Sequence, residues 1–170
     1  NRLVADGDGL TTNQAGGLGE GWSDFVALLL MARPEDLGTA TGAGWAGAYS
    51  NGAYATSGGG ADFYFGIRRV QNGTPLPATM PVSFGEDGSF NAEVHNAGEV
   101  WATMLWECYV ALLRDPRHTF AEAQERMKRY LVAGLKLTPP DPTLLEARDA
   151  LLAAAFAEDE EDFRLFWGGV

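Results

Sequence analysis

The chain has 170 residues, of which 46% are hydrophobic and 21% are charged, and its formal net charge at pH 7 is −11. This length and composition predict one globular domain that is large enough to bury a core. The negative charge argues against nucleic acids and anionic membranes as partners, because both are negatively charged themselves. The chain has a single cysteine, Cys108, so it cannot form an internal disulfide.

The first part of the chain, residues 1–36, is predicted to contain a polar loop followed by one helix. Residues Asn1–Ala15 are polar and glycine-containing, which is typical of a loop. A helix is expected from Gly19 to about Arg33, with apolar residues on nearly all of its sides, and such a helix is usually buried. Pro34 ends it, because proline disfavours helical geometry in the residue before it.

Residues 37–91 are rich in glycine, alanine, serine and threonine and show no helical period, so we expect an irregular segment. The aromatic residues Trp45, Tyr49 and Tyr54 favour a packed or substrate-facing loop. Asp62–Val70 is expected to be a short strand or a turn. Residues 92–170 have regularly spaced apolar positions that predict helices. Their expected ranges are Ala92–Arg114, Phe120–Leu137, Pro142–Ala157 with Asp141 as its N-cap, and a short Asp159–Trp167.

Two carboxylates, Glu20 and Asp24, are predicted to lie in the first turns of the first helix. Residues four apart share a helix face, so the two side chains point the same way. One interpretation is a metal site, in which Glu20 binds the ion and Asp24 accepts a hydrogen bond from a metal-bound imidazole. The other is an acidic first turn that is stabilised by the helix dipole. The spacing alone leaves both open.

Two histidines and one arginine pair are further candidates for functional residues, but the sequence around them does not assign them a role. His95 falls near the start of the helix expected at Ala92, and Glu93 is expected to hold and charge it. Taken alone, His95 is typical of a surface histidine, and the pair Arg68–Arg69 is typical of a solvated basic surface. We expect His118, in the turn before a helix, to be a loop histidine without a role.

The stretch "GGLGEGWSDFVALLL" (16–30) resembles the helix that carries the third zinc ligand in the fungalysin family of secreted zinc metallopeptidases. The fold of these enzymes is similar to that of thermolysin. Four further stretches resemble the family in the same order: "NRL" (1–3), "GIRR" (66–69), "EVHNAGEVWATMLWECYVALL" (93–113) and "GLKLTPPDPTLLEARDALLAA" (134–154). The resemblance implies a mainly α fold: the helical C-terminal lobe of a thermolysin-like metalloprotease, with an irregular Gly-rich cleft segment.

The resemblance also implies a role for individual residues. Glu20 would be the carboxylate ligand of a zinc ion, and Asp24 would accept the N–H of a zinc-bound histidine. His95 would donate a hydrogen bond to the oxyanion as water attacks the scissile carbonyl. Arg68 would bind a substrate carbonyl on the primed side, and Ile67 would line the primed-side pocket.

The motif His-Glu-x-x-His, which supplies two zinc ligands and the general base in this family, is absent from the sequence. The resemblance places it upstream of Asn1. We therefore expect residues 1–170 to be the C-terminal half of the catalytic domain of a secreted zinc endopeptidase, with the signal sequence outside this chain. Its partners would be a peptide substrate and the N-terminal lobe of the same protease.

By itself, this chain is expected to be inactive and to bind zinc weakly or not at all, with Glu20 and Asp24 facing a solvated cleft edge. The face that would meet the N-terminal lobe could instead form a homodimer. The alternative function is a non-catalytic, protease-like binding or inhibitory module.

Overall fold

The computed structural model describes residues 2–38, 45 and 93–170. Within these ranges the regular structure is helical and contains no strand, which confirms the predicted mainly α fold. Short 3-10 turns at Ala5–Gly7 and Pro34–Gly38 accompany the α-helices. Those helices are α1 (Asn13–Met31), α3 (Val94–Arg114), α4 (Phe120–Leu137), α5 (Leu144–Glu158) and α6 (Glu160–Trp167).

Helix α1 begins at Asn13, six residues before the predicted start at Gly19, so part of the predicted loop Asn1–Ala15 is helical. The side chain of Thr12 caps the helix by accepting a hydrogen bond from the N–H of Ala15 at 3.2 Å. The early start places Glu20 beyond the first turn of α1. The dipole interpretation of this residue is therefore wrong, because the effect is confined to the terminal turns of a helix.

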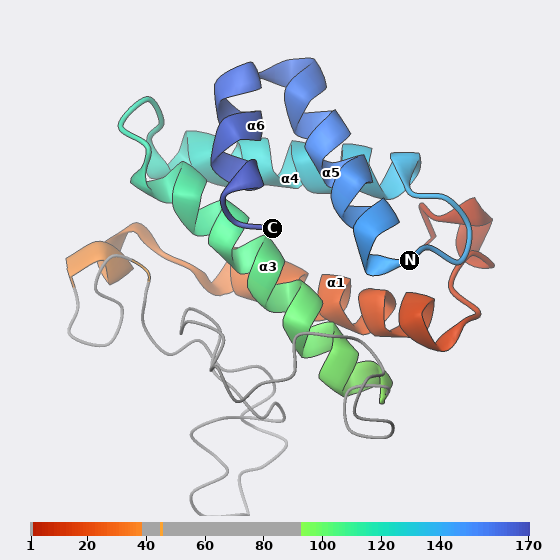
Figure 1. The fold of residues 1–170 in the computed structure, drawn as a ribbon. Helices are drawn as coiled ribbons and strands as arrows, with labels where there is room; N and C mark the ends of the chain where they lie inside the picture. The colour runs from red at the N-terminus through yellow and green to blue at the C-terminus, as the bar shows by residue number, and fades with distance from the viewer. Residues whose placement is uncertain (1, 39–44, 46–92) are drawn as a thin grey trace, which may run out of the picture.

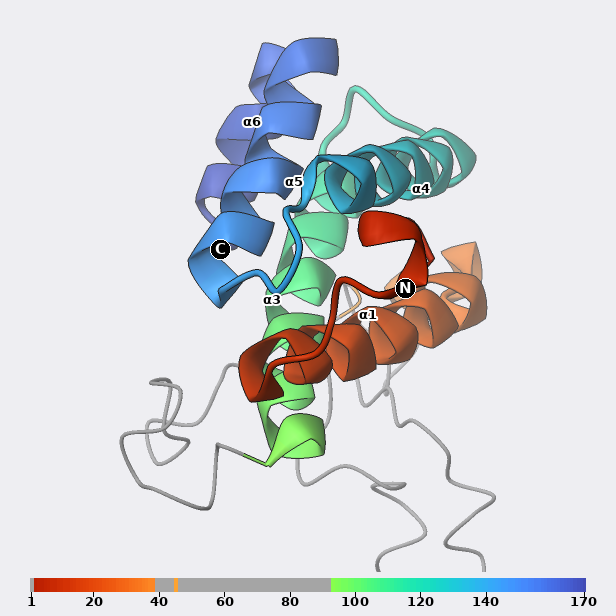
Figure 2. The same ribbon diagram turned by 90° about the vertical axis from the view of Figure 1, so that its right-hand side faces the viewer.

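Helices α1 and α3 cross each other, as both views show (Figures 1 and 2), and glycines at the crossing allow a very close approach. A Cβ atom on Gly21 would lie 2.6 Å from the carbonyl oxygen of Gly98, and one on Gly98 would lie 2.8 Å from Cβ of Glu20. A Cβ atom on Gly17 would meet Cβ of Ala97 at 2.7 Å. Glycine is unfavourable inside a helix, so its repeated use here indicates that the close crossing needs it.

Helix α3 forms the centre of the core. Its residues Trp101, Trp106 and Tyr109 are fully buried, and Trp22 of α1 packs edge-on against Trp101 with ring centroids 6.0 Å apart. In Figure 2, α1 lies against the N-terminal half of α3, whereas α4, α5 and α6 gather around the C-terminal half. The predicted packed aromatic Trp45 is buried and stacks on Phe120 at 6.2 Å.

The helix boundaries follow local capping. Helix α4 has the predicted bounds, and Thr119 and Glu122 form a capping box at its start. Helix α5 begins at Leu144 rather than at Pro142, because Thr143 caps it. The prediction of Asp141 as its N-cap is therefore wrong. The carboxylate of Asp141 instead accepts a hydrogen bond from the hydroxyl of Thr11 at 2.8 Å and so fixes the N-terminal segment.

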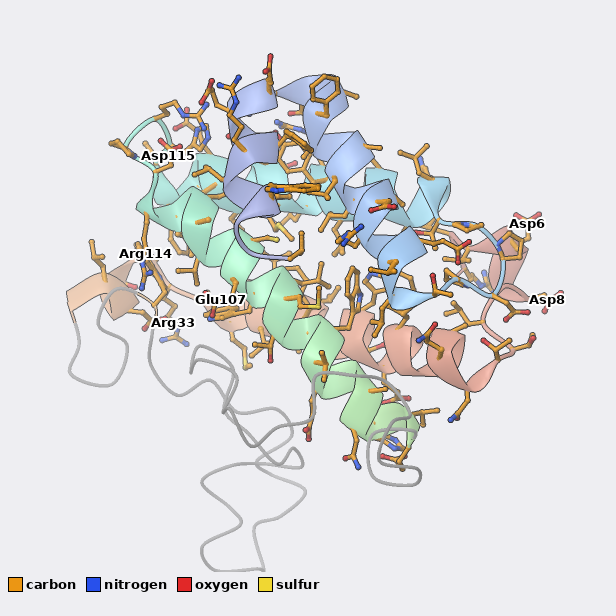
Figure 3. All side chains as sticks on the ribbon, viewed as in Figure 1. Asp6, Asp8, Arg33, Glu107, Arg114 and Asp115 are labelled. Carbon is orange, nitrogen blue, oxygen red and sulfur yellow. The ribbon has the colours of Figure 1, made fainter. Side chains whose placement is uncertain are left out.

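Charged residues occupy both ends of the described part of the molecule. Asp6 and Asp8 lie at one end, and Arg33 and Arg114 lie at the other (Figure 3). Within residues 2–38, 45 and 93–170, every helix is too short or too polar to cross a membrane.

Candidate active site at the α1–α3 crossing

The crossing of α1 and α3 brings together two of the predicted site residues. Glu20 lies in the middle of α1 with 39% of its side chain exposed, and His95 lies in the first turn of α3 with 53% exposed. The Nε2 atom of His95 is 3.5 Å from Oε2 of Glu20. A carboxylate and an imidazole from distant parts of the sequence therefore face each other at the solvent-accessible edge of the crossing.

Glu93 holds His95 from the other side, as the sequence predicted. Its Oε1 atom lies 2.6 Å from Nδ1 of the His95 ring. Its Oε2 atom accepts the backbone N–H groups of His95 and Asn96, both at 3.1 Å, so Glu93 is also the N-cap of α3. Desolvation alone would raise the pKa of Glu93, but the hydrogen bonds from His95 and Asn96 outweigh it and lower that pKa.

Asp24 differs from Glu20 in its surroundings. Its residue exposure is 8%, so it lies among the buried residues of α1. The expectation that both acids face a solvated edge holds for Glu20 and is wrong for Asp24. Asp24 lies one helical turn beyond Glu20, and burial of a carboxylate is costly unless polar groups compensate it. Its suggested part in orienting a histidine stays a prediction.

Two further predicted site residues, Arg68 and Ile67, lie outside the described residues. The same is true of the expected strand or turn at Asp62–Val70 and of most of the Gly-rich segment. The structure thus assembles Glu20, His95 and Glu93 into one cluster.

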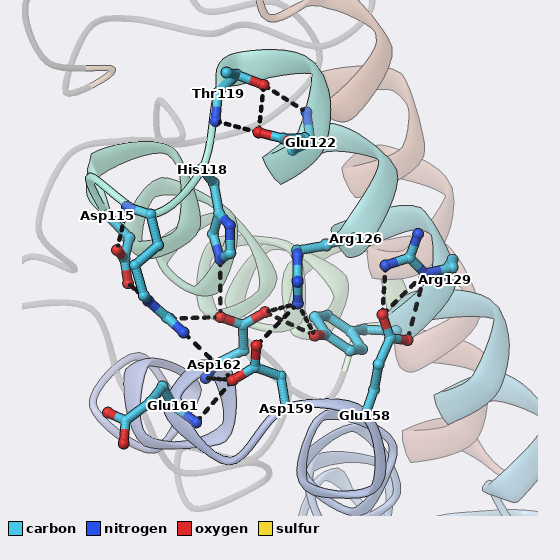
Figure 4. A network of polar contacts seen from close by, with 12 residues as sticks. Asp115, His118, Thr119, Glu122, Arg126, Arg129, Glu158, Asp159, Glu161 and Asp162 are labelled. Carbon is cyan, nitrogen blue, oxygen red and sulfur yellow. Dashed lines mark hydrogen bonds and ion pairs between the residues drawn. The ribbon is translucent and has the colours of Figure 1, made fainter.

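A second polar cluster surrounds Asp162 of α6, which is fully buried (Figure 4). The Nη2 atom of Arg117 donates to its carboxylate at 2.7 Å, Nη1 of Arg126 at 2.9 Å and the hydroxyl of Tyr130 at 2.7 Å. Nε2 of His118 lies 3.0 Å away. The cluster joins the turn after α3 to α4 and α6.

Sequence reasoning placed His118 correctly in a loop but missed its contact with Asp162. The side chain of His118 is only 5% exposed. Its partner belongs to another helix far along the chain, so no local spacing pattern could have identified the pair.

Both clusters contain residue types that bind metals. Asp115, His118 and Asp162 are close enough together to share an ion. However, Arg117 lies 2.8 Å from Asp115 and 2.7 Å from Asp162, so a guanidinium group already supplies the positive charge there. This donor set fits an ion-pair network better than a metal.

Glu20 is better placed for a metal. Its carboxylate is partly accessible, and carboxylate oxygen is a common zinc ligand. A catalytic zinc site needs three protein ligands, and Glu20 would provide one of them.

Comparison with known proteins gives one consistent result. The family model described as Fungalysin metallopeptidase (M36) matches residues 1–168. The extracellular metalloproteinase mep of Aspergillus fumigatus is 33% identical over 168 residues, which cover 91% of this chain and 24% of that protein. The extracellular metalloproteinase MEP of Neosartorya fischeri is 32% identical over 161 residues, which cover 88% of this chain and 23% of that protein. Extracellular metalloproteinase 3 of Arthroderma gypseum is 31% identical over 156 residues, which cover 85% of this chain and 22% of that protein. The chain therefore spans about a quarter of the length of these relatives.

Proposed function

Because this chain belongs to the fungalysin metallopeptidase family, we propose that it supplies part of the active site of a secreted zinc endopeptidase. The longer protein that would contain the chain is called the parent protein below. The observation that carries the proposal is the 3.5 Å approach of Glu20 and His95 across the glycine-mediated helix crossing. Core packing requires neither a carboxylate nor an imidazole at this partly exposed edge.

In this proposal Glu20 is one ligand of the zinc ion, and the other two ligands and the general base come from an upstream His-Glu-x-x-His segment. The chemistry that a bound zinc ion supplies is polarisation of the substrate carbonyl and activation of a water molecule. Asp24, on the same helix as Glu20, would orient one of the upstream zinc-binding histidines. This chain alone would be inactive and would hold zinc weakly or not at all.

His95 acts on the substrate in this proposal. It donates a hydrogen bond from Nε2 to the carbonyl oxygen as negative charge develops there during attack by water. Arg68 would bind a substrate backbone carbonyl, and Ile67 would line the pocket beside it. The substrate would be a protein or peptide outside the cell, and the N-terminal lobe of the parent protein would cover the accessible edge of the crossing.

The proposal is tested by measuring zinc content and turnover for variants of the parent protein. Glu20→Gln should lose zinc on dialysis and lose activity with it. His95→Ala should keep zinc while kcat falls on the order of 10²–10³-fold, the usual cost of removing one oxyanion donor. Glu125→Gln is the control, since this carboxylate on α4 is 60% exposed and forms a long ion pair with Lys128 at 3.8 Å. Full zinc content and full activity in Glu20→Gln would contradict the proposal, whereas a wild-type parent protein with neither zinc nor activity would favour the non-catalytic module.

A further inference from the structure

We infer that Asp141 is a positioning residue for the metal site: it fixes residues 4–12, the chain that leads into helix α1, in one conformation. These residues are called the entry segment below. The inference rests on the proposed function, in which the entry segment connects Glu20 to the two zinc-binding histidines upstream. Asp141 lies in the connection between α4 and α5, which runs beside the N-terminal segment in Figure 1.

The carboxylate of Asp141 binds the end of the entry segment through both of its oxygens. Oδ1 accepts the backbone N–H groups of Thr11 and of Thr12, the latter at 3.0 Å, and Oδ2 accepts the hydroxyl of Thr11 at 2.8 Å. The backbone N–H of Asp141 donates to the carbonyl oxygen of Gly9 at 2.7 Å. The hydrogen bonds from Thr11, and then that from Thr12, lower the pKa of Asp141, so an ionised carboxylate accepts them at neutral pH.

The backbone at this junction is held in a conformation that side chains of L-residues disfavour. The angle φ is 45° at Ala5, 55° at Asp6 and 49° at Asp141. Three of the four non-glycine residues with positive φ in the described part of the chain therefore lie at this junction. Such residues persist only where surrounding contacts over-determine them, and they cluster at functional sites.

The entry segment is also anchored at its start. The side chain of Val4 is fully buried in the core. A Cβ atom on Gly9 would lie 2.7 Å from Cγ1 of Val4 and 2.9 Å from its carbonyl oxygen, so the segment folds tightly back on itself. At its end, Thr12 caps α1 by accepting the N–H of Ala15 at 3.2 Å. Val4 and Asp141 thus hold the two ends of the segment.

The contacts of Asp141 fix a feature that the helix crossing leaves open. Close packing of α1 against α3 holds Glu20, since a Cβ atom on Gly98 would lie 2.8 Å from Cβ of Glu20. The crossing does not determine the direction from which the chain arrives at α1. Zinc ligands on the two sides of the entry segment have to meet in one tetrahedral geometry. Loss of the Asp141 carboxylate should therefore weaken zinc retention and leave the helices packed.

The first test is hydrogen exchange of the parent protein, followed by mass spectrometry of peptides that cover residues 9–12. Asp141→Gly removes the carboxylate, whereas glycine adopts the same φ freely and keeps the backbone N–H that binds Gly9. The amides of Thr11 and Thr12 should exchange on the order of 10-fold faster in this variant, while peptides from α3 stay unchanged. Unchanged exchange of residues 9–12 would overturn the inference.

Two further variants separate the carboxylate from other effects of substitution. Asp141→Asn tolerates the left-handed backbone and keeps one acceptor oxygen, so its exchange should lie between those of Asp141→Gly and the wild type. Asp149→Asn is the control, because this carboxylate on α5 is 63% exposed and pairs with the neighbouring Arg148. It should exchange like the wild type. Equal exchange in the Asp141→Gly and Asp149→Asn variants would count against a specific role of Asp141.

The second test measures how fast the zinc-loaded parent protein releases zinc to an excess of chelator. Asp141→Gly should release it roughly 10-fold faster, the lower end of the effect of residues that orient metal ligands. The melting temperature of the zinc-free protein should stay unchanged. Thr11→Val removes only the hydroxyl contact and should accelerate release less.

The outcomes separate this inference from the proposed function. If Asp141→Gly loosens residues 9–12 but releases zinc at the wild-type rate, the positioning role is refuted while the proposed function stands. A melting temperature that falls in step with faster release would also refute it, since Asp141 would then only stabilise the fold. If Glu20→Gln retains zinc as the wild type does, the proposed function itself fails.

Discussion

At the scale of single residues, Asp162 is the fully buried centre of a cluster of polar side chains. Its carboxylate is fully buried and receives hydrogen bonds from two arginines and a tyrosine, with His118 also in contact. Isolated burial of a carboxylate would strongly destabilise the fold. The surrounding donors offset this cost, and they in turn depend on the carboxylate.

Replacing Asp162 by asparagine should lower the free energy of unfolding by about 1.5–3 kcal/mol, because the hydrogen bonds from Arg117, Arg126 and Tyr130 would lose their charged acceptor. Urea unfolding measures this change. The control is Glu160→Gln, whose ion pair with Arg164 has both side chains about 60% exposed and should contribute nothing measurable. Equal stability of Asp162→Asn and the wild type would mean that the cluster is not stabilising.

The two clusters also show which residues a sequence can reveal. Glu93 and His95 are two positions apart, so their contact follows from local spacing once a helix start is expected there. Asp162 and His118 come from separate elements, and only the tertiary fold brings them together. The burial of Asp24 was likewise beyond prediction, because it depends on how α1 packs.

At the scale of elements, the crossing of α1 and α3 is the feature that creates the candidate site. Gly17, Gly21 and Gly98 remove the side chains that would hold the two helices apart. The run of Gly16, Gly17 and Gly19 made the start of α1 hard to predict, since a glycine run is typical of loops. Helix α4 had clear signals at both ends, and its bounds were predicted correctly for that reason.

Gly21→Ala tests the crossing by the sign of its effect. Helix propensity alone would stabilise α1 by roughly 1 kcal/mol. The added Cβ would meet the carbonyl oxygen of Gly98 at 2.6 Å, so we expect a net destabilisation of about 1–3 kcal/mol in thermal or urea unfolding. At Gly38 no atom of the residues that the structure describes lies within 4 Å of an added Cβ, so Gly38→Ala is the control without a clash. A stabilised Gly21→Ala variant would show that the helices do not approach this closely.

At the scale of the whole molecule, stability should depend on acidic pH. Hydrogen bonds from Arg117 lower the pKa of Asp115. Burial tends to raise the pKa of Asp162, but its contacts with His118 and Tyr130 outweigh that effect and lower it. A carboxyl group whose pKa is lower in the folded state contributes its full stability above the unfolded pKa, which is about 4. That contribution is lost as the pH falls through the folded pKa.

The free energy of unfolding should therefore change little between about pH 7 and 5 on account of these groups and fall below about pH 4. A series of urea titrations across this range measures the effect, and Asp162→Asn should show a shallower fall. A urea midpoint that is the same at pH 5 and pH 3 would contradict this account of the carboxylates.

We propose that Glu20 is a zinc ligand and that His95 stands beside the metal without binding it. A crystal structure of the zinc-loaded parent protein, with anomalous scattering recorded at the zinc edge, tests this most directly. We expect a zinc peak about 2.0–2.2 Å from a carboxylate oxygen of Glu20, the usual zinc–oxygen distance, and no bond from zinc to His95. A zinc peak at Asp115, His118 and Asp162, with none at Glu20, would contradict the account.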